Sequence, residues 1–222
     1  MAFWQIFSTS EDAMKHTSIT LLTLTAAASF AQSAPAAASA FTTSGNVAIS
    51  SDYVFRGLSQ TAGKAAVSAG YDVSHSSGLS AGIWASNVSS ALGGLEIDLY
   101  AAYGFKVGAV DVSVGYINYT YNTAANGGEA NVSASYSGLQ LKASKGVNGT
   151  LSDYYYEANY SYDVAAIKGL NLGLHYGSDR ASSNDDYAIA LNYPVLGFTG
   201  TLSFSDIQNG DSITAVSLKK TF

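Results

Sequence analysis

The chain is short of charge, proline and cysteine, and it contains no long hydrophobic run. Charged residues make up 12% of its 222 positions, about half the usual share of a soluble domain. A soluble domain of this size covers its surface with Lys, Arg, Asp and Glu, and this chain has too few of these residues to do so. No window is long and apolar enough for a membrane helix either. Such a composition is typical of a β-barrel with an apolar outer face and a polar interior.

A basic surface is also missing, and this excludes one class of partner. The formal net charge is −6, whereas nucleic acid requires clustered Lys and Arg for its phosphates. The absence of cysteine is compatible with an oxidising envelope compartment. No Cys/His or clustered-carboxylate spacing indicates a metal site, and we expect no cofactor.

The first forty residues have the pattern of a targeting segment. Lys15 and His16 precede an apolar stretch over 19–31, and the small residues AQSAPAAASA follow. Basic, apolar and small residues in this order are typical of a secretory signal peptide. We therefore expect a signal region over 1–40, with translation starting at Met14 and cleavage between 31 and 41, and a mature domain over 41–222. The alternative is an amphipathic N-terminal helix of a soluble protein.

From Ser44 onward, apolar residues recur at every second position. The clearest case is 95–105, in which Leu95, Ile97 and Leu99 alternate with Glu96 and Asp98. Many segments are about ten residues long, the length with which a tilted strand crosses a bilayer. We count twelve segments, over 46–56, 65–74, 79–88, 95–105, 110–121, 130–136, 139–145, 154–162, 170–177, 187–193, 198–205 and 213–222.

The links between these segments alternate in length. Short links at 75–78, 106–109, 137–138 and 194–197 alternate with longer polar links such as 57–64. This alternation predicts an all-β, up-and-down antiparallel transmembrane β-barrel of about twelve strands, within a range of roughly ten to fourteen. With both termini on the periplasmic side, an even strand number places every long link outside.

The terminal residue carries a further signal. Phe222, with Val216 and Leu218 in phase behind it, resembles the assembly signal that outer-membrane barrels present to the barrel-assembly machinery. Lys220 departs from that pattern, because an apolar residue is commoner there. A lysine near the interface can snorkel to water.

Several short stretches resemble the TorF family of porins. They are SDYVFRGLSQT at 51–61, GYD at 70–72, SGLSAGIWASNV at 77–88 and EIDLY at 96–100. The resemblance is strongest over 46–104, and the middle of the chain agrees mainly in pattern. It implies a barrel in the outer membrane of a Gram-negative bacterium, surrounded by lipid and lipopolysaccharide, that acts as a porin for small polar solutes.

If the apolar face of each strand meets lipid, the opposite face lines the interior. A Lys or Arg in the middle of the membrane would cost about 2–4 kcal/mol, so the alternation decides the side of each charge. A net acidic lining favours cations or neutral polar solutes. Alternatively, the charges pair and plug a narrow barrel, and the sequence leaves both readings open. The predicted pore-lining residues are Asp52, Arg56, Asp72, Glu96, Asp98, Asp111, Lys142, Glu157 and His175.

The aromatic residues of the apolar faces are interpreted as a girdle at the membrane interface, where an amphipathic ring suits the headgroup level. A sugar-stacking track is the alternative. The predicted girdle residues are Tyr53, Phe55, Tyr103, Tyr116, Tyr154, Tyr156, Tyr187 and Tyr193.

Two further classes of function find little support. A lipid-modifying enzyme needs a nucleophile beside an oriented histidine. Past the signal region only His75 and His175 remain. His75 falls in a short turn, and His175 has no serine marked as its partner, so we expect no enzyme. Acids over 179–186 could offer Ca²⁺ ligands, but solvated loop acids are the simpler interpretation. A structural or adhesive barrel is a third reading, although the loops are short. The sequence assigns no oligomeric state.

Overall fold

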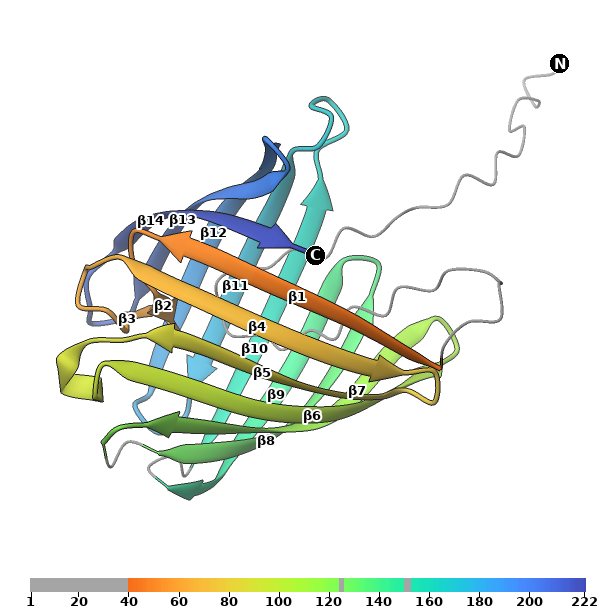
Figure 1. Ribbon diagram of the computed structural model, residues 1–222, viewed down its shortest axis with the longest axis horizontal. Coiled ribbons are helices and arrows are strands. Elements are labelled where there is room, and N and C mark those ends of the chain that lie inside the picture. The colour runs from red at the N-terminus through yellow and green to blue at the C-terminus, as the bar shows by residue number, and fades with distance from the viewer. Residues whose placement is uncertain (1–39, 124–125, 150–152) are drawn as a thin grey trace, which may run out of the picture.

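The computed structural model describes residues 40–123, 126–149 and 153–222. Within these ranges twelve long strands form one closed antiparallel barrel (Figure 1). The prediction of about twelve strands is confirmed. The predicted signal region lies outside the described residues except for its last residue. The strands are β1 (Phe41–Ser50), β4 (Ala66–His75), β5 (Leu79–Asn87), β6 (Leu95–Val107), β7 (Val110–Tyr121), β8 (Gly127–Tyr136), β9 (Leu139–Gly149), β10 (Tyr154–Asp163), β11 (Asn171–Asp179), β12 (Asn184–Val195), β13 (Phe198–Ile207) and β14 (Ile213–Thr221).

Each strand pairs with its neighbours in sequence, and β14 closes the barrel on β1. The alternation of residue types explains the two faces: Leu95 and Leu99 of β6 are exposed on the outer wall, while Glu96 and Asp98 are buried inside. The same period of two follows from the pleat of any strand. A 3₁₀ turn, η1 (Ser90–Leu92), precedes β6. In the part of the chain that the structure describes, no helix is long and apolar enough to span a membrane.

The seam between the first and last strands is shorter than the other pairing of β1. Five residue pairs join β1 to β14, from Asn46 to Ser50, and ten join β1 to β4. At the end of the seam, Gly45 and Phe222 exchange backbone hydrogen bonds of 2.8 and 2.9 Å. A side chain at Gly45 would collide with the ring of Phe222, so the glycine allows this ring to lie across the seam.

The two ends of the barrel differ in their connections. Tight turns such as Ser137–Gly138 and Leu196–Gly197 join strands at one end, which we name the short-turn end. The residues of both turns have positive φ, 48° and 85° in the first and 50° and 80° in the second, as two-residue hairpins require. The opposite, long-loop end carries the connections after β1, β5, β7, β9, β11 and β13.

The first strand ends earlier than the sequence predicts. The alternation predicts a strand over 46–56, but β1 ends at Ser50. Ser51 then donates its backbone N–H to the carbonyl of Val216 at 2.9 Å, and its hydroxyl accepts the N–H of Val216 at 3.0 Å. Beyond this bridge the chain turns into the barrel. Tyr53 is 1% exposed and Phe55 is half-buried, so their assignment to the outer girdle is wrong.

Candidate functional site

The connection between β1 and β4, residues 51–65, folds into the barrel at the long-loop end, and we name it the inward loop (Figure 1). It contains a short hairpin of β2 (Val54–Phe55) and β3 (Leu58–Ser59). Arg56 and Gly57 turn the hairpin with φ of 50° and 75°. A side chain at Gly57 would meet Ile207 and Asp186, so a glycine is required for close approach as well as for the turn.

Asp52 holds the two ends of the inward loop together. One of its carboxylate oxygens accepts the hydroxyls of Ser59 at 2.7 Å and Thr61 at 2.6 Å. The hydroxyl oxygen of Thr61 in turn accepts the backbone N–H of Tyr53 at 3.1 Å. Asp52 and Thr61 are both buried. Hydrogen bonds to a charged acceptor are the stronger kind, and they give the loop a fixed shape.

Arg56 anchors the tip of the inward loop to the far wall. Its Nη1 and Nη2 each lie 2.9 Å from an oxygen of Glu129 on β8, and the Tyr119 hydroxyl donates to the same carboxylate at 3.0 Å. The guanidinium carbon lies 3.8 Å from the ring centroid of Tyr155 on β10. Bidentate pairing and cation–π contact both favour arginine at such a place.

The anchor spans the interior. Around the barrel, four strands separate β1 from β8 on one side, and four separate β1 from β10 on the other. Burial alone would lower the pKa of Arg56, but the carboxylate of Glu129 outweighs it and holds that pKa above its ordinary value. The guanidinium therefore stays charged, and the loop crosses the barrel as a bridge.

The base of the inward loop packs against the near wall. Tyr53 meets Trp84 of β5 edge-on, with ring centroids 5.3 Å apart. Ala66 and Val88 complete this buried apolar cluster. Closer to the tip, the rings of Phe55 and Tyr119 lie 6.0 Å apart. Apolar burial at both places holds the loop inward.

Several predicted pore-lining charges are paired on neighbouring strands. Lys142 lies 2.9 Å from Glu157. His175 places Nδ1 2.7 Å from the side-chain oxygen of Asn159 and Nε2 2.9 Å from Asp186. The Tyr155 hydroxyl donates to the same Asp186 at 3.0 Å, which links these charges to the Arg56 anchor. The arrangement agrees with the reading in which interior charges pair.

Glu96 and Asp98 of β6 differ from these pairs. Their exposed fractions are 1% and 0%. One oxygen of Glu96 accepts the Tyr121 hydroxyl at 2.7 Å. The other, and both oxygens of Asp98, have no hydrogen-bond partner among the described residues. Two neighbouring carboxylates therefore lie buried with three oxygens unsatisfied.

The remaining predicted pore-lining residues, Asp72 and Asp111, lie nearer the short-turn end. Asp72 of β4 accepts the Tyr100 hydroxyl at 2.6 Å on the inner face. Asp111 is exposed and pairs with Lys106 beside the turn between β6 and β7. It therefore lies at the rim of the short-turn end rather than inside the barrel.

The inward loop leaves little room beside it. The space between the loop and the wall of β11–β14 measures about 20 Å³ and is lined by Asp52, Arg56, His175, Asp186 and several serines. A space of that size holds roughly one water molecule. The loop therefore narrows the interior at this level.

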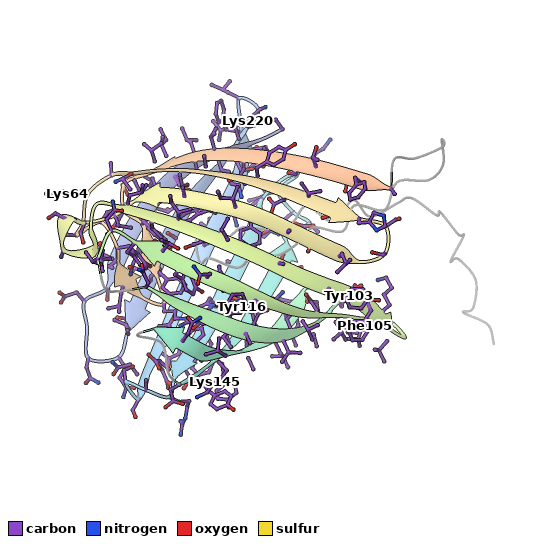
Figure 2. All side chains as sticks on the ribbon, turned by 60° about the horizontal axis from the view of Figure 1, so that its bottom comes forward. Lys64, Tyr103, Phe105, Tyr116, Lys145 and Lys220 are labelled. Atoms are coloured by element: carbon purple, nitrogen blue, oxygen red, sulfur yellow. The ribbon has the colours of Figure 1, made fainter. Side chains whose placement is uncertain are left out.

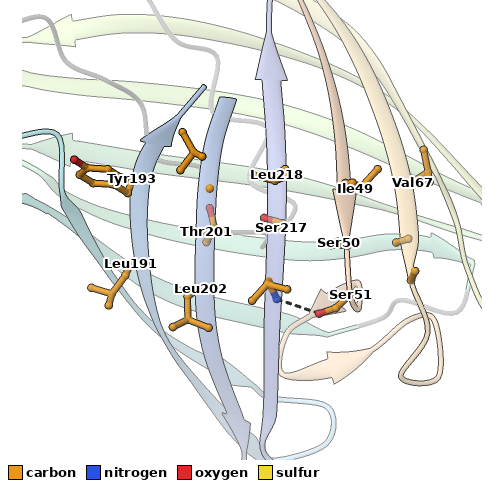
Figure 3. A pocket seen from close by; sticks show the side chains of 15 residues that line it. Ile49, Ser50, Ser51, Val67, Leu191, Tyr193, Thr201, Leu202, Ser217 and Leu218 are labelled. Carbon is orange, nitrogen blue, oxygen red and sulfur yellow. Dashed lines mark hydrogen bonds between the residues drawn. The ribbon is translucent and has the colours of Figure 1, made fainter. Parts of the chain in front are cut away.

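The outer wall is apolar and aromatic. Tyr103, Phe105 and Tyr116 project from it in Figure 2, and Tyr154, Tyr156, Tyr187 and Tyr193 are also exposed. Lys220 is exposed and donates to the carbonyl of Gly197 at 2.7 Å. An apolar groove of about 750 Å³ runs over the seam, with Ile49, Val67, Leu191, Leu202 and Leu218 among its lining residues (Figure 3).

The structure also brings in residues that the sequence did not single out. Glu129 and Asp186 fell in predicted loops, yet they bind Arg56 and His175. Tyr119 and Tyr121 share the polar face of β7 with Asp111 by simple alternation, and this signal could have identified them. The partnership of Arg56 with Glu129, 73 residues away, leaves no mark in the sequence.

Comparison with known proteins gives a family and a fold. Residues 34–211 match the family described as "Bacterial protein of unknown function (Gcw_chp)", and the chain belongs to that family. No curated protein matches the sequence. The resemblance to the TorF family stays a prediction.

Solved porins share the architecture. The structure of the "KdgM porin" is similar with a TM-score of 0.59 at 10% identity, covering 81% of this chain and 98% of that chain. The "KdgM porin in complex with disordered oligogalacturonate" gives a TM-score of 0.58 at 10% identity, covering 82% and 98%. At this identity the likeness shows the fold alone.

Proposed function

We propose that this member of the Gcw_chp family is a channel of the bacterial outer membrane that passes small polar solutes, with the inward loop as its narrowest part. The observation that carries the proposal is the separation of a mainly apolar outer face from a mainly polar inner face around a closed barrel. Apolar side chains such as Leu99 and Ile189 are exposed outside, and polar ones such as Ser144 and Asn192 are buried inside. A closed barrel satisfies its backbone groups within a bilayer, which suits a membrane span.

The proposal includes the placement of the barrel. The exposed tyrosines Tyr103, Tyr116, Tyr154, Tyr156, Tyr187 and Tyr193 would lie at the headgroup level among lipid and lipopolysaccharide. Phe222 would act as the assembly signal, and the short-turn end, where both described chain ends lie, would face the periplasm. Selective reaction of short-turn or long-loop cysteine variants with an impermeant thiol reagent on intact cells tests this orientation.

We further propose a preference for cations or neutral solutes. Arg56 and Lys142 are each neutralised by a carboxylate, whereas Glu96 and Asp98 face no positive side chain at salt-bridge distance among the described residues. The potential beside the inward loop is therefore negative. Oligogalacturonate, the ligand named for the KdgM porin, is a polyanion and does not suit a negative potential.

A non-conducting barrel is the second candidate, and the small space beside the inward loop favours it. The interior charges that pair there would then close the barrel rather than select solutes. His175 contacts Asn159, Tyr155 and Asp186 rather than a serine, so neither candidate includes an enzyme.

Planar-bilayer recording of the purified, folded protein separates the two candidates. The channel proposal expects discrete conductance steps and a reversal potential shifted toward that of the cation in a salt gradient. Folded protein that shows the heat-dependent gel shift of an intact barrel, yet gives silent bilayers, would support the closed barrel instead.

A further inference from the structure

Two carboxylates lie buried under the inward loop, and among the described residues no positive side chain pairs with them. Glu96 and Asp98 are 1% and 0% exposed and share the inner face of β6. With one residue between them, their Cα atoms are about 7 Å apart along the strand. Both side chains can therefore reach one ion between them.

The surroundings supply oxygen and aromatic groups rather than positive charge. The Tyr121 hydroxyl donates to Glu96. Tyr53 of the inward loop lies beside the same pair: burial and then the charges of Glu96 and Asp98 raise the pKa of its phenol. The nearby cation Arg56 is already engaged by both oxygens of Glu129. The pair thus has more acceptor oxygens than donors among the described residues.

An unpaired buried carboxylate is strongly unfavourable, and two adjacent ones are more so. A proton shared between the two carboxyl groups would remove one of the two charges and leave the other buried. One divalent cation would neutralise both charges and would bind the three free oxygens at once. Hard oxygen ligands of this kind suit Mg²⁺ and Ca²⁺.

We propose that Glu96 and Asp98 form a binding site for one hard divalent cation, of the Mg²⁺ or Ca²⁺ class, beneath the inward loop. Among the described residues no group of three or more His, Cys, Asp or Glu side chains surrounds a common point. The protein therefore supplies two carboxylates, and water completes the shell, as is usual for Mg²⁺. The proposal does not depend on conduction.

Terbium luminescence tests the site directly. The barrel is refolded from urea in detergent with Tb³⁺, a hard ion excited through nearby aromatic rings. Trp84 lies opposite Asp98 across the β5–β6 pair, and Tyr53 packs against Trp84. We expect bound Tb³⁺ that Ca²⁺ or Mg²⁺ displaces. Asp98→Asn and Glu96→Gln should each weaken binding by about tenfold or more.

Asp72→Asn is the matched control, because Asp72 is an inner-face carboxylate with a hydrogen-bond partner, and it should bind Tb³⁺ like the wild type. Equal binding by Asp98→Asn and Asp72→Asn would mean that the ion sits elsewhere. The absence of Tb³⁺ binding by the folded wild type would equally overturn the proposal.

Thermal unfolding gives a second readout that a folding defect cannot imitate. In EDTA, Asp98→Asn should be at least as stable as the wild type, because the change removes an unpaired charge without altering shape. Ca²⁺ should then raise the unfolding temperature of the wild type and leave that of Asp98→Asn unchanged. Equal responses of the two proteins would show that the carboxylates hold protons instead.

Discussion

The two halves of the barrel interior are built from different residues. The half nearer the long-loop end holds the inward loop, the Arg56 anchor and the buried acids Glu96 and Asp98. The half nearer the short-turn end is lined by small polar groups such as Ser133 and Ser135, and it also contains Asp72, which accepts the Tyr100 hydroxyl. Its hydrogen bonds are local, as between Thr201 and Asn192 at 2.8 Å. The constriction is therefore confined to one level, and we name the other half the vestibule.

Removal of the anchor should have the largest effect on this contrast. Arg56→Ala leaves Glu129 buried without its partner, and loss of one member of a buried pair costs about 3–5 kcal/mol. We expect a lower unfolding temperature and, because the inward loop is released, a larger unitary conductance in planar bilayers.

Arg180→Ala, at an exposed arginine of the long-loop end, is the control for lost charge and should change neither quantity. The double variant Arg56→Met with Glu129→Gln removes the unpaired acid and should recover stability while it keeps the larger conductance. If the conductance of both Arg56 variants equals that of the wild type, the loop is not the constriction.

Loss of the Thr61 hydroxyl at the base of the inward loop should have the next largest effect on the constricted half. Thr61→Val removes a donor to Asp52 and the acceptor of the Tyr53 N–H. Buried groups left unpaired cost about 1–3 kcal/mol. We expect faster proteolysis within residues 51–65, measured by mass spectrometry. The exposed Thr214→Val on β14 serves as the control, and equal cleavage of the two would contradict the role of Thr61.

Neutralisation of acids should reveal which half sets selectivity. In EDTA, where no divalent cation neutralises the pair, Glu96→Gln with Asp98→Asn should move the reversal potential toward zero in a salt gradient, because both acids lie beside the constriction. Asp111→Asn, at the rim of the short-turn end and paired with Lys106, should move it less. A larger shift from Asp111 would place the selective level at the opposite end.

The smallest effects should come from the vestibule itself. Ser133→Ala and Ser135→Ala alter neutral side chains on the inner face of β8, and Ser135→Ala removes only a long hydrogen bond of 3.5 Å from Gln140. Substitutions without a buried partner usually change stability by less than about 0.5 kcal/mol. Unfolding temperature and unitary conductance should both stay at wild-type values, and a marked loss of conductance would show that this half also limits passage.

The sequence predicts the barrel well because alternation is a local signal. The order of residues alone shows the faces of Leu95, Glu96, Ile97 and Asp98. The positions of the hairpin turns follow from turn residues such as Gly138. The inward loop is different. Tyr53 and Phe55 alternate with Asp52 and Arg56 in the same way whether the rings meet lipid or the barrel interior.

What distinguishes the two outcomes lies far away in the chain. The chain leaves the wall just after a bridge between Ser51 and Val216, and the tip contacts Glu129 and Tyr155 on other strands. None of these partnerships produces a period or a motif. The sequence also does not show that Glu96 and Asp98 are fully buried, because two acids on alternate positions are common on any solvated strand.

The bridge between Ser51 and Val216 also has a consequence for the order of assembly. It joins residues 165 positions apart, at the seam where the first strand meets the last. Contacts of such separation carry the greatest loop-closure entropy and form late. The hydrogen bonds that fix Ser51, where the inward loop begins, form only when β14 is in place. A nascent barrel therefore remains open until its final strand arrives.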